Sequence, residues 1–116
     1  MSKYITIDWE ILEIVHLGQT YHKVFASTKD RDMWRMNSGI TSVKKQVYFP
    51  DPLKTEYHVF GYSGSEYVLT EGQYGIRVEY NKPIISNILE YSRKAGYKIK
   101  RLQEDEAYKI LDTYLG

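Results

Sequence analysis

The sequence contains no cysteine, and this absence excludes several kinds of chemistry at once. Without thiols the chain forms no disulfide, offers no thiol nucleophile and supplies no thiolate ligand to a metal. No run of apolar residues approaches the ~20 that a helix needs to cross a bilayer, so we expect no membrane partner. The first residues lead straight into alternating polar and apolar positions, with no evident signal peptide. Together these absences favour a cytoplasmic protein.

Linear catalytic, nucleotide and metal motifs are also missing. The chain has neither the Gly-x-Gly-x-x-Gly fingerprint nor the lysine-containing P-loop. Gly61-Tyr62-Ser63-Gly64 differs from a hydrolase nucleophile elbow because its second glycine comes one place early and the turn joins two strands. Of the three histidines, His16 and His22 would face each other only across a three-residue loop, and zinc would still need a third ligand. We therefore expect no metal, no cofactor and no enzyme, and keep an active site without a linear motif as a second alternative.

Composition indicates an ordinary folded domain with one unusual feature. The 116 residues fit one domain that spans 1–116, with 42% apolar and 27% charged residues. A net charge of +1 argues against both a strongly acidic and a strongly basic surface. The unusual feature is tyrosine, which occurs 12 times.

The first part of the chain predicts strands. Residues 4–17 alternate between apolar and polar positions, which is typical of a half-buried strand, although a helix from Asp8 to the glycine at 18 is a rival interpretation. Further strands are expected at 21–27 and 41–49. Between them, Ser27 to Asp30 fits a capping box that would open a short helix or turn through Met36. Pro50-Asp51-Pro52 predicts a stiff turn.

Residues 57–70 predict a central β-hairpin. Aromatic and β-branched residues flank Ser63-Gly64, and glycine supplies the positive φ of a tight two-residue loop. With this loop, Phe60 would face Tyr67 and His58 would face Leu69. A change of one residue in loop length would exchange the paired sets. A further strand is expected at 76–80.

After residue 80 the period of the apolar residues changes from two to that of a helix. Asn81 can cap a helix that ends before Gly96, and its apolar stripe would consist of Ile84, Ile85, Ile88, Leu89, Ser92 and Ala95. A short strand at 97–102 precedes a last helix whose buried face would carry Ala107, Ile110, Leu111 and Tyr114. The pattern predicts an α+β domain: a mainly antiparallel sheet of about five or six strands, with two C-terminal helices packed on one face.

Two surfaces could bind a partner. The favoured one is a tyrosine-rich sheet face, because tyrosine suits protein interfaces, and it comprises Tyr57, Tyr62, Tyr67, Tyr74 and Tyr80. The same residues fit equally well a half-buried sheet that binds nothing. We expect this face to dock on another protein, as in small viral or mobile-element accessory proteins that inhibit a host factor, which is an analogy of size and composition. The alternative is nucleic-acid or nucleotide binding through a basic stretch: Arg93, Lys94, Tyr97, Lys98, Lys100 and Arg101. The same stretch also fits a helix end followed by an edge strand that lysines protect. An uncovered edge strand would also permit a homo-oligomer.

Overall fold

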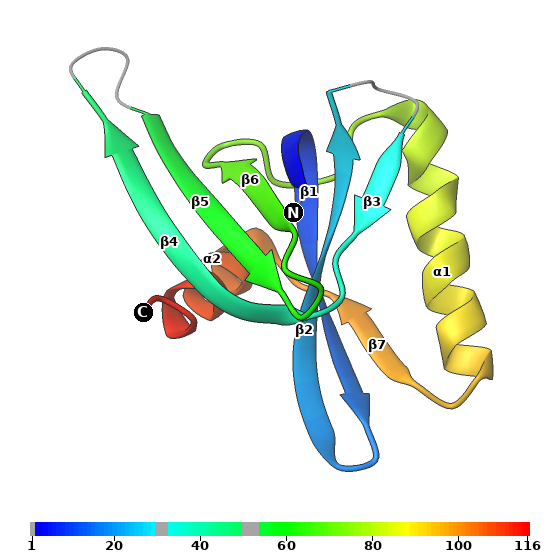
Figure 1. Ribbon diagram of the computed structural model, residues 1–116. Helices are drawn as coiled ribbons and strands as arrows, with labels where there is room; N and C mark the ends of the chain where they lie inside the picture. Colours follow the sequence, from blue (N-terminus) through cyan, green and yellow to red (C-terminus); the bar gives the residue numbers. More distant parts are fainter. Residues whose placement is uncertain (1, 30–32, 50–53) are drawn as a thin grey trace.

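The computed structural model describes residues 2–29, 33–49 and 54–116 (Figure 1). These parts form a single α+β domain, so the predicted fold class is confirmed. The elements are β1 (Lys3–His16), β2 (Gln19–Thr28), β3 (Trp34–Met36), β4 (Ile40–Tyr48), β5 (Lys54–Gly61), β6 (Glu66–Thr70), the 3₁₀ turn η1 (Glu79–Asn81), α1 (Lys82–Lys94), β7 (Lys98–Arg101) and α2 (Glu104–Thr113).

Strand β1 organises the sheet. The sheet runs in the order β3-β2-β1-β6-β5-β4, and β7 also pairs with β1. Strand β2 lies along one edge of β1, while the other edge pairs first with β6, in parallel, and further along with β7, antiparallel. The strand interpretation of residues 4–17 is therefore confirmed against the helical one. Because Leu17 and Gly18 form the turn to β2, His22 lies opposite Glu13 and His16 lies on the other face.

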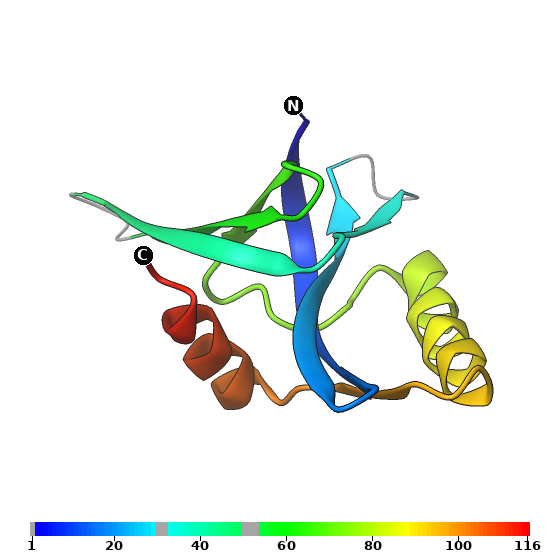
Figure 2. The ribbon, with the colours of Figure 1, turned by 60° about the horizontal axis from the view of Figure 1, so that its bottom comes forward.

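The two helices cover opposite sides of the β1–β2 ribbon rather than one common face (Figure 2). Trp9 and Ile11 of β1 share a buried cluster with Leu111 of α2. Leu12 and Ile14, which point the other way, share a second cluster with α1. The ribbon is apolar on both sides, so each side needs its own helix.

The central hairpin is present, but its register differs from the expected one. Val59 pairs with Tyr67 and His58 with Val68, one place away from the predicted pairs. The reason is the loop: β5 ends at Gly61 and β6 begins at Glu66, so the connection is longer than Ser63-Gly64. As a result Tyr57 and Tyr67 point into the core.

The expected strand at 76–80 does not form. The backbone of this segment bonds instead to buried carboxylates of β1. Glu10 accepts a hydrogen bond from the amide of Ile76 at 2.9 Å. Asp8 accepts hydrogen bonds from the amides of Arg77 and Val78 at 2.8 and 3.0 Å. These bonds hold an irregular segment against β1, and the chain then turns through η1 into α1.

The predicted helix or turn through Met36 is also corrected, because residues 34–36 form strand β3 against β2. Asp30 and the expected turn at 50–52 lie outside the described residues. The predicted strands at 21–27, 41–49 and 97–102 and both helices are confirmed, with Gly96 at a φ of 96° directly after α1. No helix in the described part of the chain is long and apolar enough to span a membrane.

Candidate functional site

The five tyrosines of the predicted docking face do not gather on one surface. Tyr57 and Tyr67 are only 3% exposed and pack in the cluster that α2 covers. Burial raises the pKa of Tyr67 to about 12 and also raises the pKa of Tyr57. These two rings stabilise the core and leave no surface on which a partner could dock.

Tyr74 also has an internal role, whereas two tyrosines remain exposed. The Tyr74 hydroxyl donates to the carbonyl of Leu102 at 2.7 Å and accepts from the amide of Ile11 at 3.2 Å. Burial raises the pKa of Tyr74 above its ordinary value. Tyr62 is 74% exposed and Tyr80 66% exposed, so these two alone of the five present most of their ring to solvent.

The basic stretch separates into structural and accessible residues. Arg101 forms two hydrogen bonds with the carboxylate of Glu10, at 2.6 and 2.5 Å. Glu10 is 4% exposed and also binds the amide of Ile76. Arg101 therefore holds β7 and the segment before α1 against β1, and its charge is already compensated.

Two of the other four cations in this stretch also have acidic neighbours. Lys94 lies 3.2 Å from Glu90 on α1, and Lys100 lies 3.6 Å from Glu13 on β1. In the described ranges, Arg93 and Lys98 have no carboxylate within ion-pair distance. The surface therefore carries two uncompensated cations where the sequence alone suggested five.

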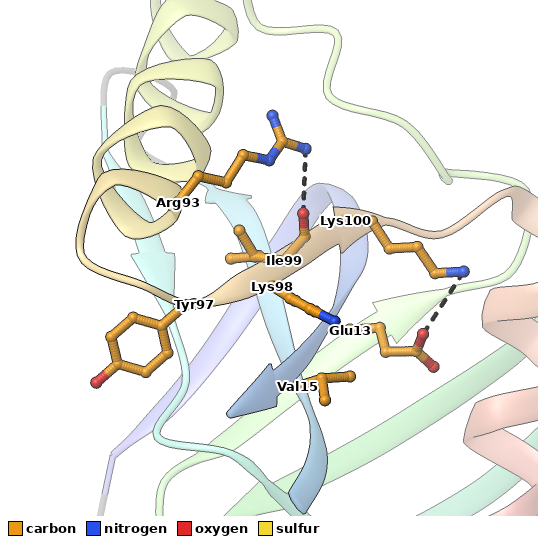
Figure 3. A pocket seen from close by; sticks show the side chains of 7 residues that line it. All are labelled: Glu13, Val15, Arg93, Tyr97, Lys98, Ile99 and Lys100. Carbon is orange, nitrogen blue, oxygen red and sulfur yellow. Dashed lines mark hydrogen bonds and ion pairs between the residues drawn. The ribbon is translucent and has the colours of Figure 1, made fainter. Parts of the chain in front are cut away.

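A hollow follows β7 where these residues lie (Figure 3). Its volume is about 370 Å³, within the range of small ligand sites. We refer to it as the β7 groove and define it by its lining: Glu13, Val15, Arg93, Tyr97, Lys98, Ile99 and Lys100. Glu13 and Val15 lie opposite Lys100 and Lys98 in the β1–β7 ladder, so these four side chains share one face of the sheet. Arg93, which bonds to the carbonyl of Ile99, extends the groove to the outer edge of β7.

The residues beside the groove form a polar chain across four elements. Tyr114, at the end of α2, bonds to His22 Nδ1 at 3.0 Å, and His22 Nε2 bonds to Glu13 at 3.1 Å. The other oxygen of Glu13 faces Lys100. Tyr114, His22 and Glu13 thus follow one another as the nucleophile, the base and the orienting acid do in a catalytic triad. However, burial and the nearby Tyr62 raise the pKa of Tyr114, so its phenol is kept neutral, and both ring nitrogens of His22 are occupied. The chain of bonds thus ties α2 to the sheet.

A second histidine network lies on β5 and β6. His58 bonds to Glu66 at 2.5 Å and to Glu56 at 3.2 Å. Burial raises the pKa of Glu56, but hydrogen bonds from Lys54 and Tyr48 outweigh it and lower that pKa overall. Among the described residues no group of three or more His, Asp or Glu side chains is arranged to hold a metal ion.

The sequence identified the basic half of the β7 groove and missed its other half. Arg93, Tyr97, Lys98 and Lys100 come from the predicted stretch, but Glu13 and Val15 come from the first strand. The one signal in the sequence for this half was Glu13, a carboxylate among the apolar residues of a strand. Its neighbour Lys100 is revealed only by the pairing of β1 with β7.

Comparisons with models of protein families, with curated protein sequences and with solved structures find no match. The function is therefore inferred from the geometry of the protein alone.

Proposed function

We propose that this protein is a non-catalytic binding module that docks on a partner protein, and that the β7 groove is the docking site. The groove combines the apolar surface of Val15 and Tyr97 with a few fixed charges. Protein interfaces have this composition, with an apolar centre and a polar rim. The proposal keeps the expected kind of partner and moves the contact from the tyrosine face to the edge of β7.

The observation that carries the proposal is the pairing of charges around β7. Carboxylates of β1 compensate Arg101 and Lys100, and Glu90 of the same helix compensates Lys94. Tight binding to a phosphate backbone requires several cations that release counterions, and paired lysines contribute little to it. A groove with two unpaired cations and an apolar wall suits a partner that presents a limited number of acidic side chains.

Nucleic-acid or nucleotide binding is the second candidate, and one observation favours it. Arg93 and Lys98 flank Tyr97, an arrangement that can hold a phosphate beside a stacked base. The Tyr97 ring already stacks on His16, with centroids 4.0 Å apart and planes 25° apart, so only its other face could take a base. We therefore place this function second.

Photo-crosslinking from inside the groove separates the two candidates. A crosslinking amino acid at Lys98 should capture a protein when the purified variant is irradiated in a lysate of the cells that make the protein. The matched control is the same amino acid at Tyr91, which is 78% exposed on α1 and does not line the groove. A protein captured at both positions, or nucleic acid captured at 98, contradicts the proposal.

Inhibition of a host factor is the more specific part of the proposal. The protein captured at position 98 would be purified and its activity measured with and without this protein. We expect loss of that activity at stoichiometric concentration, and unchanged activity would remove the inhibitor interpretation.

A further inference from the structure

The outer edge of β7 presents backbone groups to the groove. Among the described strands β7 pairs only with β1, in antiparallel register, so alternate residues bond inward and outward. Leu102 donates to the carbonyl of Ile11 at 3.0 Å, which makes the even positions the inward ones. The amide and carbonyl groups of Ile99 and Arg101 therefore point away from β1.

One contact confirms this direction. The Arg93 guanidinium donates from the last turn of α1 to the carbonyl of Ile99 at 3.1 Å, and Figure 3 shows it reaching β7 from the helix. The Arg93 side chain thus takes the position that the backbone amide of a neighbouring strand would occupy. It covers the edge with a flexible group that an incoming strand could displace.

The edge strand β4, at the far end of the sheet, is closed differently. On β4 the amide of Val43 donates to the carbonyl of Tyr114 at 3.0 Å, and Leu115 continues this contact as a bridge. There the chain's own backbone occupies the position that a partner strand would need. Beside β7 no backbone segment of the described residues does so.

The charges along the β7 edge select the occupant. Lys98 and Lys100 project from one face of the strand, and Arg93 approaches from the helix. A second copy of the chain would bring lysines against lysines, the arrangement by which exposed edges avoid self-association. Acidic side chains on an incoming strand would instead meet Lys98 and Arg93, which have no carboxylate partner within the described ranges.

We propose that an acidic, extended segment of the partner protein adds to the sheet as a strand along the outer edge of β7. This inference rests on the proposed function and specifies its partner and mode, which is recognition by strand addition. Amides of the segment donate to the carbonyls of Ile99 and Arg101. The displaced Arg93 then pairs with a carboxylate of the segment, while alternate acidic side chains lie over Lys98.

A titration with model peptides tests this mode without the natural partner. Isotope-labelled protein is titrated with an alternating Glu-Val octapeptide, and amide shifts and hydrogen exchange are followed by NMR. We expect exchange of the Ile99 and Arg101 amides to slow at least tenfold at saturation, while the inward amides of Lys98 and Lys100 change little. An alternating Lys-Val octapeptide, the matched control, should have no such effect.

A charge-reversed variant supplies the second control. In Lys98→Glu with Lys100→Glu both changed side chains are exposed, so the fold should persist and the preference should change to the Lys-Val peptide. Three results would overturn the inference: no change at the Ile99 and Arg101 amides, the same change with an oligothymidylate, or concentration-dependent protection without peptide, which would indicate self-pairing. If crosslinking at Lys98 still captures a protein in any of these cases, the proposed function stands and only the mode is wrong; failure of the function itself would appear as no protein at that position.

Discussion

Two carboxylate–cation pairs join β1 to β7, and they differ in almost every physical respect. Glu10 is buried, binds both nitrogens that Arg101 presents and also accepts from the amide of Ile76. Glu13 is half-buried, lies 3.6 Å from the exposed Lys100 and gives its other oxygen to His22. The first pair faces the irregular segment before α1, and the second borders the β7 groove.

The difference shows how neighbouring basic residues can divide between folding and binding. The Glu10–Arg101 pair is fixed from the Glu10 side, because loss of Arg101 would leave a buried carboxylate without its partner, although the Arg101 side chain itself is 40% exposed. A loose pair at the surface has little effect on stability, since water compensates either charge. Arg101 is therefore unsuitable as a probe of binding, whereas Lys98 and Lys100 can be changed without disturbing the fold.

Removal of Glu10 is expected to have the largest effect. Glu10→Ala should lower the free energy of unfolding by about 2 kcal/mol, because it removes the charge-assisted hydrogen bonds to Arg101 and leaves the buried amide of Ile76 unbonded. The matched change Lys100→Ala, which breaks the second pair from its exposed side, should lower it by less than about 1 kcal/mol. Urea denaturation of both variants measures this contrast, and equal losses would show that the two pairs are not different in kind.

A pair of tyrosine variants extends the contrast to the phenolic side chains. Tyr74→Phe removes the hydroxyl that bonds to Leu102 and Ile11 and should destabilise the protein by about 1–2 kcal/mol. Tyr62→Phe, at an exposed ring, should change stability by less than about 0.5 kcal/mol. The same denaturation experiment applies, and a neutral Tyr74→Phe would contradict the internal role of this residue.

High pH should separate the buried tyrosines from the exposed ones. Burial raises the pKa of Tyr67 to about 12 in the folded protein, whereas an unfolded chain has a tyrosine pKa of about 10. Because the folded pKa is the higher, this stabilising contribution is complete below pH ~10 and is lost as the pH rises towards ~12. Ultraviolet absorbance should show late phenolate formation that coincides with loss of near-ultraviolet circular dichroism; full ionisation of all tyrosines in a still-folded protein would contradict the burial.

The smallest expected effect concerns the loose pair itself. A double-mutant cycle with Glu13→Ala and Lys100→Ala should give a coupling energy below about 0.5 kcal/mol, which decreases further with added salt. A coupling of several times this size would mean that Lys100 is held as firmly as Arg101.

Local sequence patterns predicted those elements whose stability depends on local periodicity. The alternation in β1 and the apolar stripes of α1 and α2 correspond to buried positions such as Ile11, Leu89 and Leu111. The prediction was wrong where the backbone bonds to side chains distant in sequence. Residues 76–78 have the composition of a strand, yet their amides bind Asp8 and Glu10.

The sequence predicted the basic residues of the candidate site but not their neighbours or the burial of the tyrosines. A longer hairpin loop turned Tyr57 and Tyr67 into the core, and no local signal specified that length. Likewise, the compensation of Arg101 by Glu10 depends on the pairing of β7 with β1, two strands from opposite ends of the chain.

Amide hydrogen exchange of the free protein tests most directly whether the outer edge of β7 is open. The amides of Ile99 and Arg101 should exchange faster than those of Lys98 and Lys100, in alternation along the strand, because only the latter two bond to β1. Uniform slow exchange of all four amides would mean that another part of the chain covers this edge, and the β7 groove could then not accept a strand.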